Sequence, residues 1–269
     1  MTPLAGHAII TGGSSGIGLA TARLLAQSGM DVSLIARGEA RLAAAKAALD
    51  ALRRRPAQKF AIYPADIGDP DQAERAVGLA ITTSGAPDLL VTSAGIARPG
   101  YFAELPREAF EEAMRVNYFG TLHAIRAAVP PMRERRRGRI ALVSSGAGLF
   151  GIFGYSAYAP SKFALRGLAE TLRAELRGDG IGVSIIYPPD TDTPQLAEEN
   201  RMKPRETRRI TRHGGLWQPE DVAHALVRGA TAGRFTITPG WRIAALHRLA
   251  GPLGPLLARY FDYLARRDR

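Results

Sequence analysis

The chain has 269 residues, of which 46% are hydrophobic and 23% are charged, a composition that excludes a disordered protein. It contains no cysteine, which excludes disulfides, cysteine-ligated metals and thiol nucleophiles. A formal net charge of +11 is compatible with anionic partners, but no nucleic-acid-binding motif accompanies it, so we expect no nucleic acid partner.

No segment has the features of a membrane span or a signal peptide. No apolar run reaches the ~18 residues that a spanning helix needs. The first eleven residues lack a charged start followed by an apolar stretch. The histidines are scattered without the spacing of metal ligands, so we expect no metal site. These features together favour a cytoplasmic protein.

Short apolar segments rich in β-branched residues alternate with amphipathic segments along the chain. The expected strands are His7–Thr11, Val32–Ala36, Phe60–Ala65, Leu89–Thr92, Ile140–Ser144 and Val183–Tyr187. The expected helices are Ile17–Ser28, Glu39–Arg54, Asp71–Ser84, Arg107–Arg135 and Ser156–Arg177. This alternation predicts an α/β fold with one Rossmann-type, doubly wound parallel sheet and helices on both faces. Since there is no internal repeat or linker, we expect a single domain over residues 1–269.

A glycine-rich turn joins the first expected strand to the first expected helix. Glycines let the backbone approach a pyrophosphate closely, and the start of the helix offers free N–H groups to its negative charge. The turn therefore predicts a dinucleotide site. Its candidate residues are Gly12, Ser14, Ser15, Gly16, Ile17 and Gly18.

The end of the second expected strand favours NADPH over NADH. A carboxylate there would bind the ribose 2′-hydroxyl of NAD, whereas Arg37 follows the strand directly and can bind a 2′-phosphate. Arg41, one turn into the next helix, can assist. After the third strand, Asp66 and Ile67 are placed to meet the adenine, although Asp66 could equally cap the helix that begins near Pro70.

Tyr158 and Lys162 are the centre of the expected chemistry. They are four residues apart in an expected helix, so the phenol and the ammonium share one face. A tyrosine pKa of about 10 is too high for easy proton transfer, and a neighbouring cation is expected to lower it, which makes Tyr158 a general acid. Ser145, at the end of a strand, is expected to polarise a ketone oxygen. Asn117 is a poor helix former inside an expected helix, and holding a water in a proton relay to Lys162 would account for it.

Two regions break the alternation of strands and helices. Residues 188–215 are polar and follow a strand, so we expect a helical flap over the substrate site at the carboxyl edge of the sheet. Residues 241–269 mix large apolar side chains with arginines and are interrupted by two Gly-Pro pairs. They are expected to form an amphipathic extension.

These motifs, taken in order, resemble those of the short-chain dehydrogenase/reductase family over about residues 5–240. The resemblance implies about seven strands in the order 3-2-1-4-5-6-7, frequent dimers or tetramers, and the catalytic roles given above. The family usually has Asn-Asn-Ala-Gly where this chain has Thr-Ser-Ala-Gly, and Pro-Gly where it has Pro-Pro. The further cofactor contacts that the resemblance implies are Ser93, Ala94, Gly95, Pro188, Thr191 and Thr193, together with Tyr158 and Lys162.

Within that family, the flap and the segment around Tyr158 are similar to the 3-ketodihydrosphingosine reductases. The similarity includes the sequence Tyr-Pro-Pro-Asp-Thr-Asp-Thr-Pro at residues 187–194. It implies NADPH-dependent reduction of a lipid-like keto-base to dihydrosphingosine in sphingolipid biosynthesis. One alternative is the reduction of 3-oxoacyl chains on an acidic carrier protein or of another lipid ketone. A second alternative, from another functional class, is a non-catalytic NADPH-binding regulator. The presence of Ser145, Tyr158 and Lys162 argues against it.

The substrate of that group bears an amine, for which Asp190, Asp192 or Glu198 could supply a carboxylate. The alternative is that the two aspartates only cap the flap helix.

The C-terminal extension could bind the cytoplasmic face of a membrane peripherally. It could instead close a dimer interface or pack over an acyl tunnel. The residues on which these readings rest are Trp241, Leu246, Leu249, Leu253, Leu256, Leu257, Tyr260 and Phe261, with Arg242, Arg248, Arg259, Arg266 and Arg267.

Overall fold

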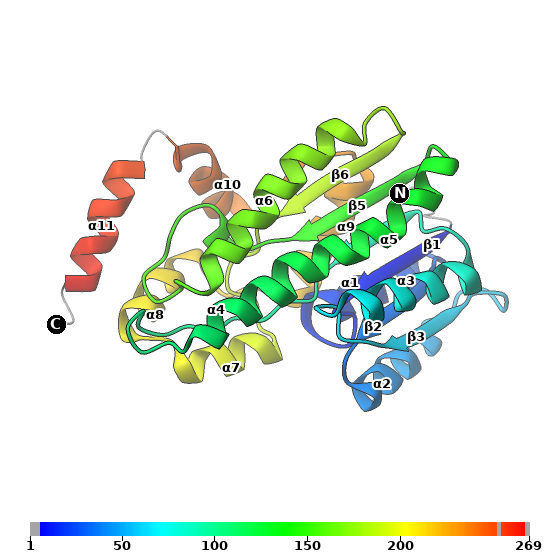
Figure 1. The fold of residues 1–269 in the computed structure, drawn as a ribbon, viewed down its shortest axis with the longest axis horizontal. Helices are drawn as coiled ribbons and strands as arrows, with labels where there is room; N and C mark the ends of the chain where they lie inside the picture. Colours follow the sequence, from blue (N-terminus) through cyan, green and yellow to red (C-terminus); the bar gives the residue numbers. More distant parts are fainter. Residues whose placement is uncertain (1–5, 252–253, 267–269) are drawn as a thin grey trace.

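Seven parallel strands form the centre of the molecule in the order β3-β2-β1-β4-β5-β6-β7, which confirms the expected α/β fold and strand order. The structure is a computed structural model that describes residues 6–251 and 254–266 (Figure 1). The strands are β1 (His7–Thr11), β2 (Asp31–Ala36), β3 (Phe60–Pro64), β4 (Leu89–Thr92), β5 (Gly138–Val143), β6 (Ile181–Ile186) and β7 (Thr236–Ile237). The sequence pattern predicted the first six within about two residues at each end and missed β7, which is too short to show a period.

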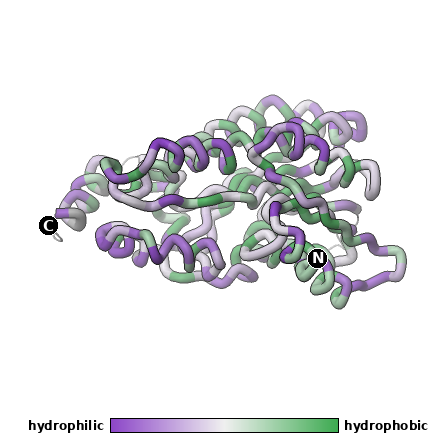
Figure 2. The backbone as a smooth tube through the Cα atoms, turned by 60° about the horizontal axis from the view of Figure 1, so that its bottom comes forward, coloured by the Kyte–Doolittle hydropathy of each residue, from purple (hydrophilic) through white to green (hydrophobic). Residues whose placement is uncertain are grey.

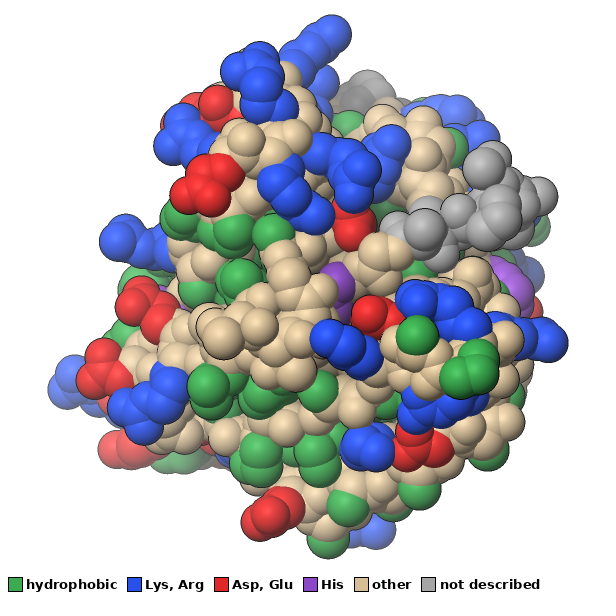
Figure 3. Space-filling view, turned by 90° about the vertical axis from the view of Figure 1, so that its right-hand side faces the viewer, with side chains coloured by type: hydrophobic (Ala, Val, Ile, Leu, Met, Phe, Trp, Pro, Cys, Tyr) green, Lys and Arg blue, Asp and Glu red, His purple; other side chains and the backbone are tan. Residues whose placement is uncertain are grey.

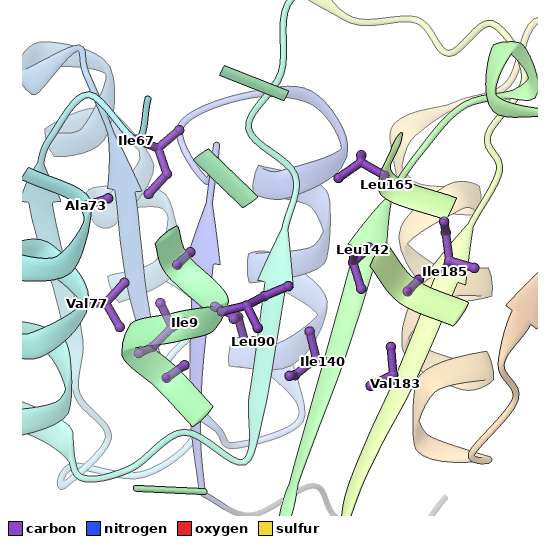
Figure 4. Packing of buried hydrophobic residues seen from close by; sticks show 14 of the residues in the cluster. Ile9, Ile67, Ala73, Val77, Leu90, Ile140, Leu142, Leu165, Val183 and Ile185 are labelled. Carbon is purple, nitrogen blue, oxygen red and sulfur yellow. The ribbon is translucent and has the colours of Figure 1, made fainter. Parts of the chain in front are cut away.

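Helices cover both faces of the sheet and enclose two hydrophobic cores. Successive β1 residues point to opposite faces, so that Ile9 belongs to one core and Ile10 to the other. Figure 4 shows Ile9 in its core beside Leu90, Ile140 and Val77. Helices α1 (Gly16–Gln27), α2 (Glu39–Asp50) and α9 (Pro219–Thr231) cover the Ile10 face, and α3 (Pro70–Ser84), α5 (Gly120–Glu134) and α6 (Tyr158–Glu175) cover the other. In Figure 2 the hydrophobic segments run through the middle of the molecule.

The long helix expected over residues 107–135 is divided into three parts. These are α4 (Arg107–Ala113), a π-helical turn η1 (Met114–Phe119) and α5. A π-turn widens the helix by one residue per turn and leaves its own hydrogen-bond pattern out of step with the α-helices on either side. The π-turn spans only 6 residues, which is too short for its different period to show in the hydrophobic pattern of the sequence.

Apart from α9, the helices that follow β6 lie toward one end of the molecule (Figure 1). Residues 188–215 contain α7 (Pro194–Met202), α8 (Arg205–Thr211) and a 3₁₀ turn η3 (Arg212–Gly214), and residues 241–266 contain most of α10 (Gly240–Leu249) and all of α11 (Gly254–Arg266). Helix α11 contacts α8, and the ring of Phe261 stacks on that of Phe150 at 5.1 Å.

The C-terminal extension is partly buried and partly exposed. In α10 the side chain of Ile243 is buried in the core, whereas Trp241 is 76% exposed. In α11 Leu256, Tyr260 and Tyr263 are exposed. In the part of the chain that the structure describes, no helix is long and apolar enough to span a bilayer. Of the residues that the sequence singled out in this extension, Leu253 and Arg267 lie outside the described residues.

Several arginines of the basic clusters bind carbonyl groups and carboxylates of the chain itself. Arg54 and Arg55 donate to the carbonyl oxygens of Gln27 and Gly29 at the end of α1, where a cation also complements the helix dipole. Arg137 pairs with Asp88 at 2.6 Å. On the face shown in Figure 3, basic side chains occur at several separate places with acidic side chains among them. Part of the positive charge is therefore structural.

Candidate active site

One cavity of about 630 Å³ collects most of the residues that the sequence singled out. It lies beyond the carboxyl ends of β1, β2, β4 and β5, where open parallel sheets bind ligands. Gly18 and Asn117 do not lie on its wall. Within the described residues no group of three His, Asp or Glu side chains is arranged to hold a metal ion. The predicted residues on the wall are Gly12, Ser14, Ser15, Gly16, Ile17, Arg37, Arg41, Asp66, Ile67, Ser93, Ala94, Gly95, Ser145, Tyr158, Lys162, Pro188, Thr191 and Thr193.

The glycine turn brings two loops and a helix closer together than side chains would allow. Gly12 and Gly16 have φ of +70° and +51°, which other residues rarely adopt. A Cβ on Gly12 would lie 2.6 Å from the backbone nitrogen of Ala94, and one on Gly18 would collide with the carbonyl oxygen of Gly12. Gly18 therefore serves the packing of α1 against the turn.

The start of α1 has free hydrogen-bond donors. Ser15 occupies the N-cap position, but its side chain makes no capping hydrogen bond, and the first turn contains no acidic residue. The first N–H groups of a helix have no partner inside the helix and attract negative charge. Together with the close-packed glycine turn, this arrangement fits the pyrophosphate of a dinucleotide.

Two guanidinium groups lie at the end of β2. Arg37 is exposed and lines the cavity directly after the strand. Arg41 lies over Gly38, the residue after Arg37: a Cβ added to Gly38 would be 3.1 Å from Arg41 Nε. No acidic side chain of β2 or of the residue after it lines the cavity. The pair could hold a phosphate carried on the ribose of a dinucleotide.

Asp66 belongs to the cavity wall and does not cap a helix. It accepts hydrogen bonds from Arg115 at 2.9 Å and from the backbone of Gly68 at 3.0 Å. Partial burial raises the pKa of Asp66, but these hydrogen bonds together with the positive charges of Arg115 and Arg37 outweigh it, so the net pKa is below the ordinary value. The cap of α3 is Asp69, which accepts from Gln72. The alternative that Asp66 is the cap is therefore wrong.

Tyr158 and Lys162 lie on one face of the first turn of α6, and both are buried. Lys162 Nζ is 5.6 Å from the centroid of the Tyr158 ring and donates to the carbonyl oxygen of Val143 at 3.2 Å. Ser145 lies at the end of β5, accepts from the backbone of Ala147 at 3.2 Å and is hydrogen-bonded to Tyr158. The three side chains thus converge on one place in the cavity.

The electrostatics of this place differ from the expectation that the ammonium lowers the tyrosine pKa. Burial raises the pKa of Tyr158 above its ordinary value, and the charge of Glu199 raises it further, while the hydrogen bond with Ser145 lowers it only in part. Burial also lowers the pKa of Lys162, to about 8. Because Tyr158 keeps its proton at neutral pH, it is in the form that a proton donor needs.

Asn117 lies in the π-turn and is fully buried. Its side-chain oxygen accepts from the backbone of Ile96 at 2.8 Å, and its amide donates to the carbonyl oxygen of Ile96 and to the hydroxyl of Ser161. A Cβ on Gly95 would lie 3.1 Å from Asn117 Oδ1 and 3.4 Å from Lys162 Nζ. Asn117 therefore joins the loop after β4 to α6 next to Lys162, and its predicted water relay stays a prediction.

The beginning of the flap lies against the glycine turn. The carbonyl oxygen of Pro188 accepts from Gly146, and the hydroxyl of Thr191 donates to the carbonyl oxygen of Pro189. Thr193 caps α7, and a Cβ on Gly16 would lie 2.9 Å from its methyl group. Because Thr193 is the cap, the alternative that Asp190 and Asp192 cap the flap helix is wrong.

The carboxylates of the flap have different surroundings. Asp190 pairs with the buried Lys203 at 3.1 Å. Glu198 is mostly exposed and pairs with Arg98 at 3.4 Å, and Asp192 is exposed and absent from the cavity wall.

Glu199 lines the cavity, is buried, and was not among the residues that the sequence singled out. Its spacing of four residues from both Gln195 and Lys203 on one helix is a signal that could have found it.

Comparison with known proteins agrees with this geometry. A family model described as short chain dehydrogenase matches residues 6–204. The chain is 43% identical over 244 residues to a 3-dehydrosphinganine reductase of Danio rerio, covering 89% of this chain and 74% of that protein. It is 42% identical over 235 residues to a 3-ketodihydrosphingosine reductase of Mus musculus, covering 87% of this chain and 71% of that protein. The chain also superposes on a crystal structure of a short-chain dehydrogenase/reductase from Burkholderia phymatum in complex with NAD. The TM-score is 0.83 at 27% sequence identity, covering 96% of this chain and 97% of that chain.

Proposed function

The chain belongs to the short-chain dehydrogenase family and is an oxidoreductase that acts on CH–OH groups, and on this premise we propose that it reduces 3-ketodihydrosphingosine to dihydrosphingosine with NADPH. The observation that carries the proposal is the buried group of Ser145, Tyr158 and Lys162 in one cavity, in a chain 43% identical to a 3-dehydrosphinganine reductase. A non-catalytic regulator would not need this group.

Two features support NADPH as the nicotinamide cofactor. The free N–H groups at the start of α1 would hold its pyrophosphate, and Arg37 with Arg41 would hold the 2′-phosphate. Asp66 and Ile67 would lie beside the adenine, and Lys162 would reach the nicotinamide ribose.

The arrangement of the catalytic side chains supports ketone reduction. NADPH supplies a hydride to the ketone carbon when bound. Ser145 donates a hydrogen bond to the ketone oxygen, which polarises the bond, and the same oxygen then receives the phenolic proton of Tyr158. The high pKa of Tyr158 keeps that proton available until negative charge develops on the oxygen. The buried Lys162 lies beside the Tyr158 ring, and its pKa of about 8 allows it to gain or lose a proton near neutral pH.

The far wall of the cavity suits a long alkyl chain. Ile243 and Leu246 of α10 and Phe261 of α11 line it, and Phe150 stacks on Phe261. A cavity with an apolar wall at one end and catalytic polar groups at the other fits a single-chain lipid ketone. This arrangement supports the reading in which the C-terminal extension packs over an acyl tunnel.

The substrate assignment is tested with the purified full chain and NADPH. We expect NADPH oxidation with 3-ketodihydrosphingosine in detergent micelles and little with an acetoacetyl group on an acidic carrier protein. Turnover of the carrier substrate alone would keep the fold and the catalytic group but replace the proposed function with the carrier-linked alternative.

We also propose that the enzyme is cytoplasmic and forms a homo-oligomer, as the family resemblance implies. Helix α11 would have two roles: Phe261 packs over the cavity, and the exposed side chains of the helix bind the membrane face peripherally. The exposed Leu256, Tyr260 and Tyr263 together with Arg259 give this helix the composition of an interfacial one.

Removal of residues 252–269 should weaken binding to anionic vesicles by about tenfold or more, because apolar contacts and about 1 kcal/mol per basic residue are lost. Co-sedimentation with phosphatidylglycerol vesicles measures this. The cut follows α10 because Ile243 belongs to the core. Equal sedimentation of the truncated and full chains, both folded by circular dichroism, would show that α11 is not the anchor.

A further inference from the structure

A buried group of polar and charged side chains lies beside Tyr158. Glu199 accepts a hydrogen bond from the hydroxyl of Tyr155 at 3.1 Å and one from the amide of Gln195 at 3.0 Å. Lys203 Nζ lies 3.1 Å from the carboxylate of Asp190 and 3.7 Å from that of Glu199. Glu199 is 7% exposed and Lys203 is 4% exposed. We call these five residues the flap cluster.

The flap cluster contains one more carboxylate than ammonium. Buried charges are stable only when they are paired, so two carboxylates that share one ammonium leave room for a second cation. Burial correspondingly raises the pKa of Glu199, although Lys203 acts against this. A cationic ligand bound at the flap cluster would therefore neutralise the excess negative charge and be stabilised by it.

The carboxylates of the flap cluster face the cavity, and the cation does not. Asp190, Gln195, Glu199 and Tyr155 line the cavity wall, whereas Lys203 is absent from it. Lys203 thus neutralises one negative charge from behind and leaves hydrogen-bond acceptors on the cavity side. A ligand in the cavity meets acidic oxygens there.

The flap cluster is next to the reacting centre. The rings of Tyr155 and Tyr158 meet edge to face with centroids 5.2 Å apart. After burial, the charge of Glu199 has the largest influence on Tyr158. A group bonded to the carbon next to the ketone would consequently lie within reach of Glu199 when the ketone oxygen is at Tyr158 and Ser145.

We propose that Glu199, held in place by Tyr155 and Gln195, binds the 2-ammonium group of the keto substrate and makes the enzyme selective for α-amino ketones. The inference rests on the proposed function and adds a specificity residue to it. An ammonium has three donors, and the buried Glu199 and the partly buried Asp190 supply acceptors for them on the cavity wall. Of the acidic residues that the sequence indicated for this role, Asp190 belongs to the flap cluster, Glu198 lines the cavity but pairs with Arg98, and Asp192 is absent from the cavity wall.

A purely structural role for the flap cluster predicts a different result. If Glu199 only tied α7 to the loop that carries Tyr155, its loss would affect every ketone equally. Recognition of the ammonium predicts a loss restricted to ketones that carry one. Comparing two substrates in one variant therefore separates the two roles.

The test uses Glu199→Gln in the full chain, which keeps the size of the side chain and an acceptor for Tyr155. We expect kcat/KM for 3-ketodihydrosphingosine to fall about 10- to 50-fold, as for loss of a charged hydrogen bond. We expect the 2-deamino ketone of the same chain length, measured in the same micelles, to change less than about threefold. The matched control is Glu111→Gln on α4, which lies outside the cavity wall and whose exposed pair with Arg107 should leave the ratio of the two substrates unchanged.

If Glu199→Gln loses activity equally on both ketones, or on neither, the inference about the ammonium site is overturned. The proposed function still holds in that case, provided that the wild-type protein turns over 3-ketodihydrosphingosine. Wild-type turnover of only the deamino ketone would overturn both. If the variant does not fold, the wild-type protein decides the question through inhibition by octadecylamine and octadecanol. Competitive inhibition by the amine at about tenfold lower concentration supports the ammonium site, and equal inhibition rejects it.

Discussion

Tyr158→Phe should lower kcat by about 100- to 10,000-fold, the range expected for loss of a positioned general acid. The substitution removes only the phenolic oxygen. Phe fits the buried position because the Tyr158 ring already packs against the ring of Tyr155. Steady-state NADPH oxidation with 3-ketodihydrosphingosine measures kcat, and fluorescence titration with NADPH should show that the cofactor still binds.

Tyr155→Phe is the matched control for this variant. It removes a phenolic oxygen three residues earlier, one that donates to Glu199. We expect it to lower kcat far less than Tyr158→Phe does. A loss as large in Tyr155→Phe, or full activity in Tyr158→Phe, would contradict the assignment of Tyr158 as the proton donor.

Arg37→Asp should reverse the preference between the two nicotinamide cofactors. The variant loses a charge-assisted pair with the 2′-phosphate and places a like charge against it, while the new carboxylate can accept from a free ribose 2′-hydroxyl. We expect the ratio of kcat/KM for NADPH to that for NADH to fall by about 100- to 1,000-fold, of which one lost charged pair accounts for about 10- to 150-fold.

The same change at an arginine far from the cavity controls for net charge. Arg75 on α3 is exposed and does not line the active-site cavity, so Arg75→Asp should leave the cofactor ratio unchanged. An unaltered ratio in Arg37→Asp would show that the arginine after β2 does not select the cofactor.

The sequence predicted those parts of the site whose geometry is determined by residues close together in the chain. The glycine turn, Arg37, and the pair of Tyr158 and Lys162 each occupy a few neighbouring residues, and their geometry follows from one strand end or one helical turn. The structure brings them to one cavity because strands of a parallel sheet all end at the same edge.

The remaining parts depend on burial and on distant contacts. Tyr155 and Glu199 are 44 residues apart and meet only because α7 packs on the loop before α6. The direction of the Tyr158 pKa follows from how deeply the ring is buried, which the spacing to Lys162 does not reveal. Asn117 was singled out as a poor helix former, but the π-turn that contains it left no trace in the hydrophobic pattern.

The flap cluster also constrains how this protein can diverge. Its charged members occupy positions 190, 199 and 203, where the buried Lys203 pairs with the buried Glu199 and with the partly buried Asp190. Losing Lys203 alone would leave two carboxylates without their cationic partner. Removing one partner of a buried ion pair typically lowers the free energy of unfolding by about 3–5 kcal/mol, a large share of a protein's net stability. We therefore expect these positions to change together during evolution, so that a descendant with a different substrate preference would differ at several of them at once.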